Sequence, residues 1–323
     1  RCQREGRGFD PLCPLQKINV IKSKIITKIF QNFLKNRDIR IYKKNFIYYL
    51  VFRIIRKLLS SNIIVEIYKF KIICSVRKNH NSYYLLKKCE FGDYEEIDTL
   101  NKFSNYQKVL LIDCGCNYGF YTFYTASLSK NNQVISVEAS KKTALDFLKN
   151  YDLNKFQNIS FHNKAISDKN DLEVVFNESE NDWESSLTHK NFRLKETESI
   201  KTCKIDTLVE SYNCEEFSLI IKLDIEGNEM EALKGAILTI SKFAPIIIIE
   251  FSKFIFHNKK NVNFFKNFMI ENNYNIYDTK KKKVNLDNIL LNLNQLDNDH
   301  MTIGNYFLIK KSSKQLEIFE KNG

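Results

Sequence analysis

The feature that most constrains the fold of this 323-residue chain is a series of short apolar runs after residue 108. The runs are VLLID, QVISVEA, ISFHNKAI, LIIKLD and PIIIIEF, and the segments between them have helical character. Continuous apolar runs are typical of parallel strands buried on both faces. The alternation predicts a doubly wound α/β sheet. Two later runs, YNIYDT and NYFLIKK, are expected as edge or closing strands.

Three segments between the runs are expected as helices: YGFYTFYTASLS, KTALDFLKNYDL and NEMEALKGAILTI. Apolar residues recur at helical spacing in the last of them: Met230, Leu233, Ala236, Ile237 and Ile240. The stretch 168–202 is polar and irregular and holds Trp183, so we expect a loop there that contacts substrate.

Positive charge is concentrated in the first third of the chain. Residues 1–90 hold 21 Lys and Arg against 5 Asp and Glu, a net +16, whereas the remainder holds 29 against 33, a net −4. A basic surface favours anionic lipid, nucleic acid or acidic glycan, although a solvated basic face needs no partner. Four basic residues share one arc of a helical wheel: Lys43, Arg53, Arg56 and Lys57. A helix of this kind suits an anionic membrane surface or a packed face with snorkelling side chains.

These observations predict three parts of the chain. Residues 1–16 differ in composition from the rest of the chain and are expected to be non-native sequence or a fragment end. Residues 17–90 are expected as a basic N-terminal extension of helices and a β-hairpin, and residues 91–323 as the main domain. The apolar run FIYYLVF has seven residues, too few for a membrane-spanning helix. No cysteine pair has C-x-x-C spacing, so we expect reduced thiols in a cytoplasmic protein.

A glycine-rich turn follows the first run and predicts a cofactor site. It reads Asp113-x-Gly115-x-Asn117-x-Gly119. The dinucleotide pattern fails, because Asn117 and Phe120 stand where glycines are required, and no Lys-Ser/Thr pair completes a phosphate loop. An acid at a strand end suits a cationic ligand, and S-adenosylmethionine carries an ammonium and a sulfonium. Such ligands bind beyond the carboxyl ends of the strands.

The next two runs add candidate cofactor residues. Glu138 ends the second run, 19 residues after Gly119, where an acid can accept hydrogen bonds from ribose hydroxyls. That spacing alone fits NAD equally well, and a chance glutamate at a strand end is the alternative. Backbone at Ala165, after the third run, is expected to edge the adenine. Asp168 has the same expected role, or caps a turn.

The segment LIIKLDIEGNEMEALKGA places Lys222, Asp224, Glu226 and Glu229 at a strand end and helix start. Lys222 and Asp224 alternate with apolar residues and can reach the mouth of the site, whereas Glu229 suits the first turn of a helix. Glu250 stands at the equivalent point of the next run.

Taken in order, IDCGCNYGFYT, VISVEAS, NKAISD, CKIDTLVE, IIKLDIEGNEMEALKGA and PIIIIEF resemble the FkbM family of S-adenosylmethionine-dependent methyltransferases. The resemblance covers about Phe91 to Ser252, and K-x-D-x-E-G followed by L-K-G-A is its most distinctive element. The family usually has alanine where Cys116 stands. The resemblance implies a Rossmann-like, seven-stranded methyltransferase sheet and O-methylation of sugar hydroxyls or secondary metabolites.

A hydroxyl acceptor is weakly acidic, so methyl transfer to it needs a carboxylate base or a metal. Asp224 is the first candidate for either role, followed by Glu250 and Glu226. The alternative bases are histidines: His162, His189 and His257. A metal held by hard oxygen ligands would be magnesium, although the sequence shows no decisive acid cluster.

Two other functions compete with methylation of a sugar or small molecule. The basic third of the chain suggests a nucleic-acid methyltransferase that acts on RNA, but the Asn/Asp-Pro-Pro-aromatic element of amino-methylating enzymes is absent, which argues against a nucleic acid. The other alternative is a non-catalytic, membrane-associated binding protein that retains the cofactor pocket. We therefore expect a cytoplasmic enzyme that reaches an anionic membrane surface through its basic region.

Overall fold

The computed structural model describes residues 62–75, 93–179, 194–256, 258–296 and 302–321, and the backbone of strand β1 (Val20–Ile21). The chain divides into two compact units. The smaller unit comprises residues 1–94 and 148–155, and the larger comprises residues 95–147 and 156–323.

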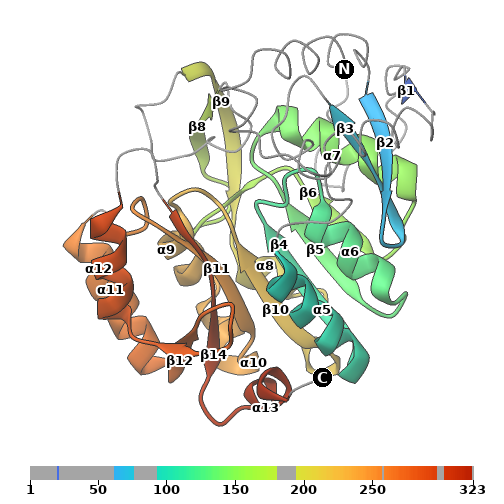
Figure 1. The fold of residues 1–323 in the computed structure, drawn as a ribbon. Helices are drawn as coiled ribbons and strands as arrows, with labels where there is room; N and C mark the ends of the chain where they lie inside the picture. Colours follow the sequence, from blue (N-terminus) through green and yellow to red (C-terminus); the bar gives the residue numbers. More distant parts are fainter. Residues whose placement is uncertain are drawn as a thin grey trace, which may run out of the picture. The chain divides into compact units, whose positions relative to one another are not determined.

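An eight-stranded sheet forms the centre of the larger unit, in the order β13–β12–β14–β11–β10–β4–β5–β6 (Figure 1). Five neighbouring strands run parallel: β4 (Val109–Cys114), β5 (Gln133–Val137), β6 (Ile159–His162), β10 (Ser218–Leu223) and β11 (Ile246–Ser252). Strand β14 (Thr302–Lys310) runs antiparallel between β11 and β12 (Tyr274–Tyr277), and β13 (Lys283–Val284) pairs antiparallel with β12. The sheet confirms the expected α/β class.

Three details of the sheet differ from the sequence-based expectation. The sheet has eight strands rather than seven, because a turn with Lys281 at φ 61° folds the chain back and lets β13 pair with β12. The runs YNIYDT and NYFLIKK form strands as expected, but neither lies at the edge of the sheet, since β14 lies between β11 and β12, and β12 lies between β14 and β13. The run ISFHNKAI divides at Asn163, whose side chain donates to the carbonyls of Glu138 and Ala139 and turns the chain out of the sheet.

Helix α6 (Phe120–Leu128) lies against β4 and β5, and α7 (Lys141–Asn154) leads from β5 to β6. The segment expected as one helix after β10 forms two, α9 (Glu229–Lys234) and α10 (Ile237–Phe243). The break falls at Gly235, where an added Cβ would lie 2.2 Å from the carbonyl oxygen of Ser167. The remaining described helices are α5 (Tyr94–Tyr106), α8 (Ile205–Val209), the 3-10 turn η1 (Cys214–Glu216), α11 (Lys259–Glu271), α12 (Leu286–Gln295) and α13 (Lys314–Glu320).

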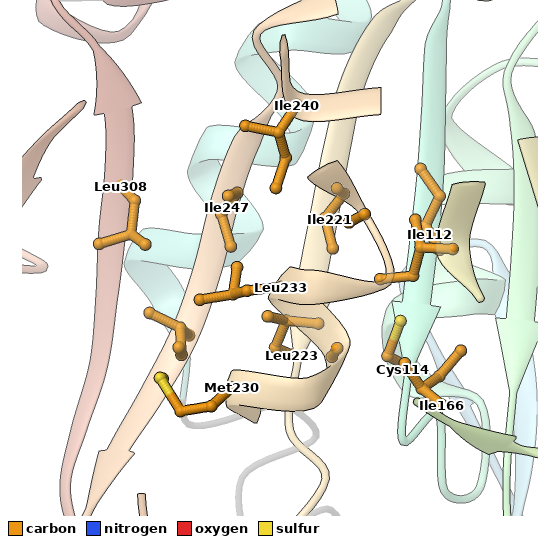
Figure 2. Packing of buried hydrophobic residues seen from close by; sticks show 14 of the residues in the cluster. Ile112, Cys114, Ile166, Ile221, Leu223, Met230, Leu233, Ile240, Ile247 and Leu308 are labelled. Carbon is orange, nitrogen blue, oxygen red and sulfur yellow. The ribbon is translucent and has the colours of Figure 1, made fainter. Parts of the chain in front are cut away.

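The hydrophobic core on one face of the sheet fixes which strand residues face the opposite side. Figure 2 shows Met230 and Leu233 of α9, with Ile240 of α10, packed beside Ile221 and Leu223 of β10. Successive strand residues point to opposite faces. Lys222 in β10, Asp113 in β4 and Ser136 in β5 therefore point away from this core, toward the face that α6 covers.

A second, three-stranded sheet follows the order β7–β9–β8, with β7 (Ala165–Ile166), β8 (Glu173–Ser179) and β9 (Leu194–Cys203). The expectation of an irregular loop over 168–202 is thus wrong for much of that stretch, because β8 and β9 pair antiparallel. Trp183 and His189 lie outside the described residues.

In the smaller unit, β2 (Asn62–Ile67) and β3 (Phe70–Ser75) form an antiparallel hairpin, and β1 pairs parallel with β2. Strand β1 lies near the start of the basic extension expected over residues 17–90, and the other residues between 17 and 60 lie outside the described residues. Within the described part of the chain, no helix is both long and apolar enough to cross a membrane.

Candidate active site

The glycine-rich turn joins β4 to α6 and leaves no room for larger side chains. Gly115 has φ 80°, and an added Cβ would lie 1.9 Å from the backbone oxygen of Asp224. Gly119 has φ 88°, and an added Cβ would lie 2.4 Å from the ring of Phe123. The turn therefore needs both glycines, for left-handed backbone and for close approach. It packs directly against the segment that follows β10.

Asp113 is the second-last residue of β4 and belongs to a buried hydrogen-bond network. The hydroxyl of Thr122 in α6 donates to Asp113 Oδ2 at 2.7 Å and lies 2.7 Å from the hydroxyl of Ser136 in β5. The other carboxylate oxygen, Oδ1, is buried and has no hydrogen-bond partner within the described residues. Burial raises the pKa of Asp113, and the charge of Lys222 opposes that rise. A buried acceptor without a donor calls for a partner such as an ordered water, an ion or a ligand.

Glu138 connects the end of β5 to the glycine-rich turn. Its carboxylate accepts hydrogen bonds from the backbone nitrogens of Asn117 at 3.0 Å and Ser140 at 2.9 Å. Burial raises the pKa of Glu138 to about 7. Asn117 has φ 50°, and its side-chain oxygen is a second buried acceptor without a partner in the described part of the chain.

The ends of β10 and β11 bring three carboxylates together. Asp224 follows β10, Glu226 stands in the next turn at φ 53°, and Glu250 lies in β11. One carboxylate oxygen from each lies within 4.8 Å of the other two. Burial, followed by the charge of Asp224, raises the pKa of Glu250 to about 7. The structure thus gathers the three residues that the sequence suggested for catalysis.

Lys222 is the positive charge of this cluster. Its side chain is 3% exposed, and its ammonium nitrogen lies 2.6 Å from Asp224 Oδ2. The same nitrogen lies 4.6 Å from the ring centroid of Tyr121 in α6. The register of β10 on β4 places Lys222 beside Asp113.

Glu229 has the structural role suggested by its position in a first helical turn. Its buried carboxylate accepts hydrogen bonds from the backbone nitrogens of Gly227 at 3.0 Å and Ile225 at 3.2 Å. Burial raises the pKa of Glu229 to about 7. The residue therefore shapes the turn that carries Glu226.

The remaining predicted residues belong to other elements than the three acids. Ala165 is buried in β7 of the small sheet, packed with Phe176 and Ile200, and its expected place beside an adenine stays a prediction. Asp168 accepts a hydrogen bond from the hydroxyl of Ser167. His162 ends β6, where burial lowers its pKa, whereas His257 lies outside the described residues.

Thr122, Ser136 and Tyr121 contact the site but were missed from the sequence. Ser136 is the polar residue inside the otherwise apolar run VISV, which was the available signal. Thr122 and Tyr121 are near-neighbours of Gly119 in the first turn of α6. Their contacts depend on how α6 lies on the sheet, which the sequence pattern does not specify.

A mostly parallel sheet with a glycine-rich turn after β4 and an acid at the end of β5 is the arrangement of Rossmann-like methyltransferases. The methyltransferase FkbM domain model matches residues 113–276. This match spans half of the chain, so the chain belongs to the FkbM methyltransferase family. No curated protein matches the chain.

Solved structures give low overall similarity. Methyltransferase FkbM from Methylobacillus flagellatus KT is 20% identical at a TM-score of 0.39, with 70% of this chain and 52% of that chain covered. An O-methyltransferase from Bacillus cereus in complex with SAH is 14% identical at a TM-score of 0.38. The match covers 68% of this chain and 80% of that chain. TYW2 from M. jannaschii in complex with AdoMet is 14% identical at a TM-score of 0.36. The match covers 76% of this chain and 84% of that chain. The chain thus spans about half the length of the Methylobacillus protein.

Proposed function

We propose that this chain is an S-adenosylmethionine-dependent O-methyltransferase whose acceptor is a hydroxyl of a sugar, polysaccharide or secondary metabolite. The observation that carries the proposal is the placement of the glycine-rich turn. Asn117 in that turn is bonded to Glu138 on one side, and Gly115 packs on Asp224 on the other. A cofactor side and an acid cluster therefore flank one turn at the carboxyl ends of parallel strands.

The residues around the turn fit the cofactor. Asp113 Oδ1 and Asn117 Oδ1 are buried acceptors that lack donors among the described residues, and a ligand with ammonium and hydroxyl groups supplies donors. The cofactor-holding residues are Asp113, Gly115, Asn117, Gly119, Glu138 and, through its backbone, Ala165. When bound, S-adenosylmethionine supplies a methyl group activated on a sulfonium.

Glu250 has the properties of the general base. A catalytic base works best when its pKa is near the working pH, and the pKa of Glu250 is about 7. As the acceptor oxygen gains the methyl group, the Glu250 carboxylate takes the hydroxyl proton. Asp224, the first candidate from the sequence, is ion-paired with Lys222 and orients the acceptor and Glu250. Glu226 is the next candidate base.

A magnesium ion at Asp224, Glu226 and Glu250 is the alternative to base catalysis, because three carboxylates suit a hard cation. The buried ammonium of Lys222 already balances Asp224, so we propose base catalysis. Retention of activity in a chelator would support this choice, and loss that magnesium restores would reverse it.

An isotope-transfer assay tests the function. Labelled S-adenosylmethionine is incubated with the purified chain and with pools of glycans, small metabolites and RNA, and the labelled pool identifies the acceptor class. We expect label in the glycan or metabolite pool. Label in RNA would support the nucleic-acid alternative, and binding without transfer would support a non-catalytic protein.

We also propose that residues 17–90 form a basic extension to a methyltransferase domain over 91–323, and that it brings a cytoplasmic enzyme to an anionic membrane. The net charge of +16 over residues 1–90 supports this location. Co-sedimentation with anionic vesicles should fall as salt rises. Equal co-sedimentation with neutral vesicles would contradict the proposal.

A further inference from the structure

A charged lysine inside an apolar strand is costly to bury unless its charge is balanced. Lys222 interrupts the run LIIKL of β10, and its side chain is 3% exposed. A buried ammonium at this position therefore needs a structural reason. The surroundings of Lys222 supply the reason.

Negative charge lies on several sides of Lys222. Its ammonium contacts Asp224 Oδ2 at 2.6 Å, and Asp113 is its register neighbour on β4. Glu250 on β11 stands two residues after Ile248, the register partner of Lys222, so its side chain lies on the same face of the sheet as the ammonium. The ring of Tyr121 closes another side at 4.6 Å from the nitrogen. A single ammonium therefore serves several carboxylates.

We propose that Lys222 is the built-in cation of the Asp224–Glu226–Glu250 cluster: it holds Asp224 and Glu250 in place and excludes a divalent metal from the cluster. Lys222 is in this sense a positioning residue, because it acts through Asp224 and Glu250 rather than on the acceptor. Its effect on turnover rests on the proposed methyl transfer. The exclusion of metal does not, and can be measured without any acceptor.

Geometry gives the reason for exclusion. The three carboxylate oxygens are close enough together to contact one cation. One Asp224 oxygen is already bonded to the ammonium, and a divalent ion at the cluster would lie beside that positive charge. Removing the ammonium takes its charge away from Asp224 and Glu250, which lie beside Glu226, and three adjacent carboxylates are the composition of a hard-cation site.

The test is Mn²⁺ binding, followed by electron paramagnetic resonance and calorimetry on the full chain. The wild type should bind no Mn²⁺ at the cluster, whereas Lys222→Met should bind one ion with a sub-millimolar dissociation constant. Glu250→Gln added to Lys222→Met should abolish that binding. Lys108→Met removes a lysine from the exposed ion pair with Glu216 and is the matched control, which should behave as the wild type.

Two results would overturn the proposal: a wild type that binds Mn²⁺ in a manner sensitive to Glu250→Gln, or a folded Lys222→Met that binds none. If Lys222→Met does not fold, Lys222→Gln replaces it and the wild-type measurement still decides. Once an acceptor is known, Lys222→Met should lower kcat on the order of a hundredfold with a smaller change in KM. Lys222→Arg, which keeps the charge, should restore part of the rate and remain free of Mn²⁺.

Discussion

The two sides of the glycine-rich turn are built differently. At the ends of β4 and β5, Glu138 is held by backbone nitrogens, and Asp113 is held by a buried hydroxyl. At the ends of β10 and β11, Asp224 is held by a side-chain ammonium and keeps 38% of its side chain exposed. The first side is preformed, because backbone donors move little. The second side depends on charge balance, so substitutions of charged residues there, and changes of pH, should alter turnover more than cofactor binding.

The largest expected effect comes from filling the turn. Gly115→Val would place a side chain into the backbone oxygen of Asp224, 1.9 Å from the Cβ position, and should abolish binding of S-adenosylhomocysteine measured by calorimetry. Gly304→Ala is the matched control, since Gly304 also has positive φ but no atom within 4 Å of the Cβ position. If Gly115→Val bound the ligand as the wild type does, the cofactor site would lie elsewhere.

Substitutions in the acid cluster should separate the two sides. Glu250→Gln keeps the shape and removes the base, so kcat should fall by about 10²–10⁴-fold while affinity for S-adenosylhomocysteine is retained. Asp224→Asn should also lower turnover more than cofactor binding. Glu231→Gln, an ion-paired acid on α9, is the control and should change neither. Lost cofactor affinity in a folded Asp224→Asn would assign Asp224 to the cofactor side.

The pH dependence of turnover should follow Glu250. Its pKa is raised to about 7 by burial and by Asp224, while Lys222 and the hydroxyl of Thr302 oppose that rise and Glu229 adds to it. The carboxylate form is the base, so kcat/KM should fall as pH drops below about 7. The acid limb should disappear in Glu250→Gln. If the acid limb persists unchanged in Glu250→Gln, the general base is Glu226 or a histidine instead.

Folding stability should show the opposite pH trend at the preformed side. The pKa of Glu138 is raised from 4.5 to about 7 by burial, so the folded chain binds a proton that the unfolded chain has released between these values. This group therefore makes the folded state less stable as pH rises through that window. Denaturation at several pH values should give a flatter trend in Glu138→Gln than in the wild type. Identical trends would mean that Glu138 is ionised in the folded protein.

The smallest effect is expected from the buried network. Thr122→Val removes the donor to Asp113 Oδ2 and should lower the free energy of unfolding by about 1–3 kcal/mol, because a buried acceptor loses its partner. Chemical denaturation measures it. Ser127→Ala, in the same helix, removes a half-buried hydroxyl bonded to a local carbonyl and serves as the control. Equal losses in both variants would contradict a special role for the Asp113 network.

Much of the sheet was predictable because parallel strands leave long apolar runs. The position of β13 was not, since its two residues carry no apolar pattern and their pairing with β12 depends on the turn at Lys281. The break at Gly235 was hidden for a related reason, because it depends on the carbonyl of Ser167, which is distant in sequence.

The sequence predicts several residues of the candidate site, but it misses Thr122, Ser136 and Tyr121 and does not give the arrangement. Alternation along β10 indicates that Lys222 and Asp224 point the same way, but not that they pair or that Glu250 joins them. The neighbours of Asp113 depend on the placement of α6 over the sheet, and no pattern within the strand encodes that placement.

The cysteine in the glycine-rich turn has a practical consequence. Cys116 is 5% exposed, and burial raises the pKa of its thiol well above the usual value. In the closed turn the thiol is protonated and reagents cannot reach it, so alkylation requires the backbone to open locally. The rate of labelling at Cys116, measured by mass spectrometry, therefore reports how often the turn opens. A ligand that bridges the turn should lower this labelling rate. Ligand binding can therefore be detected before the acceptor is known.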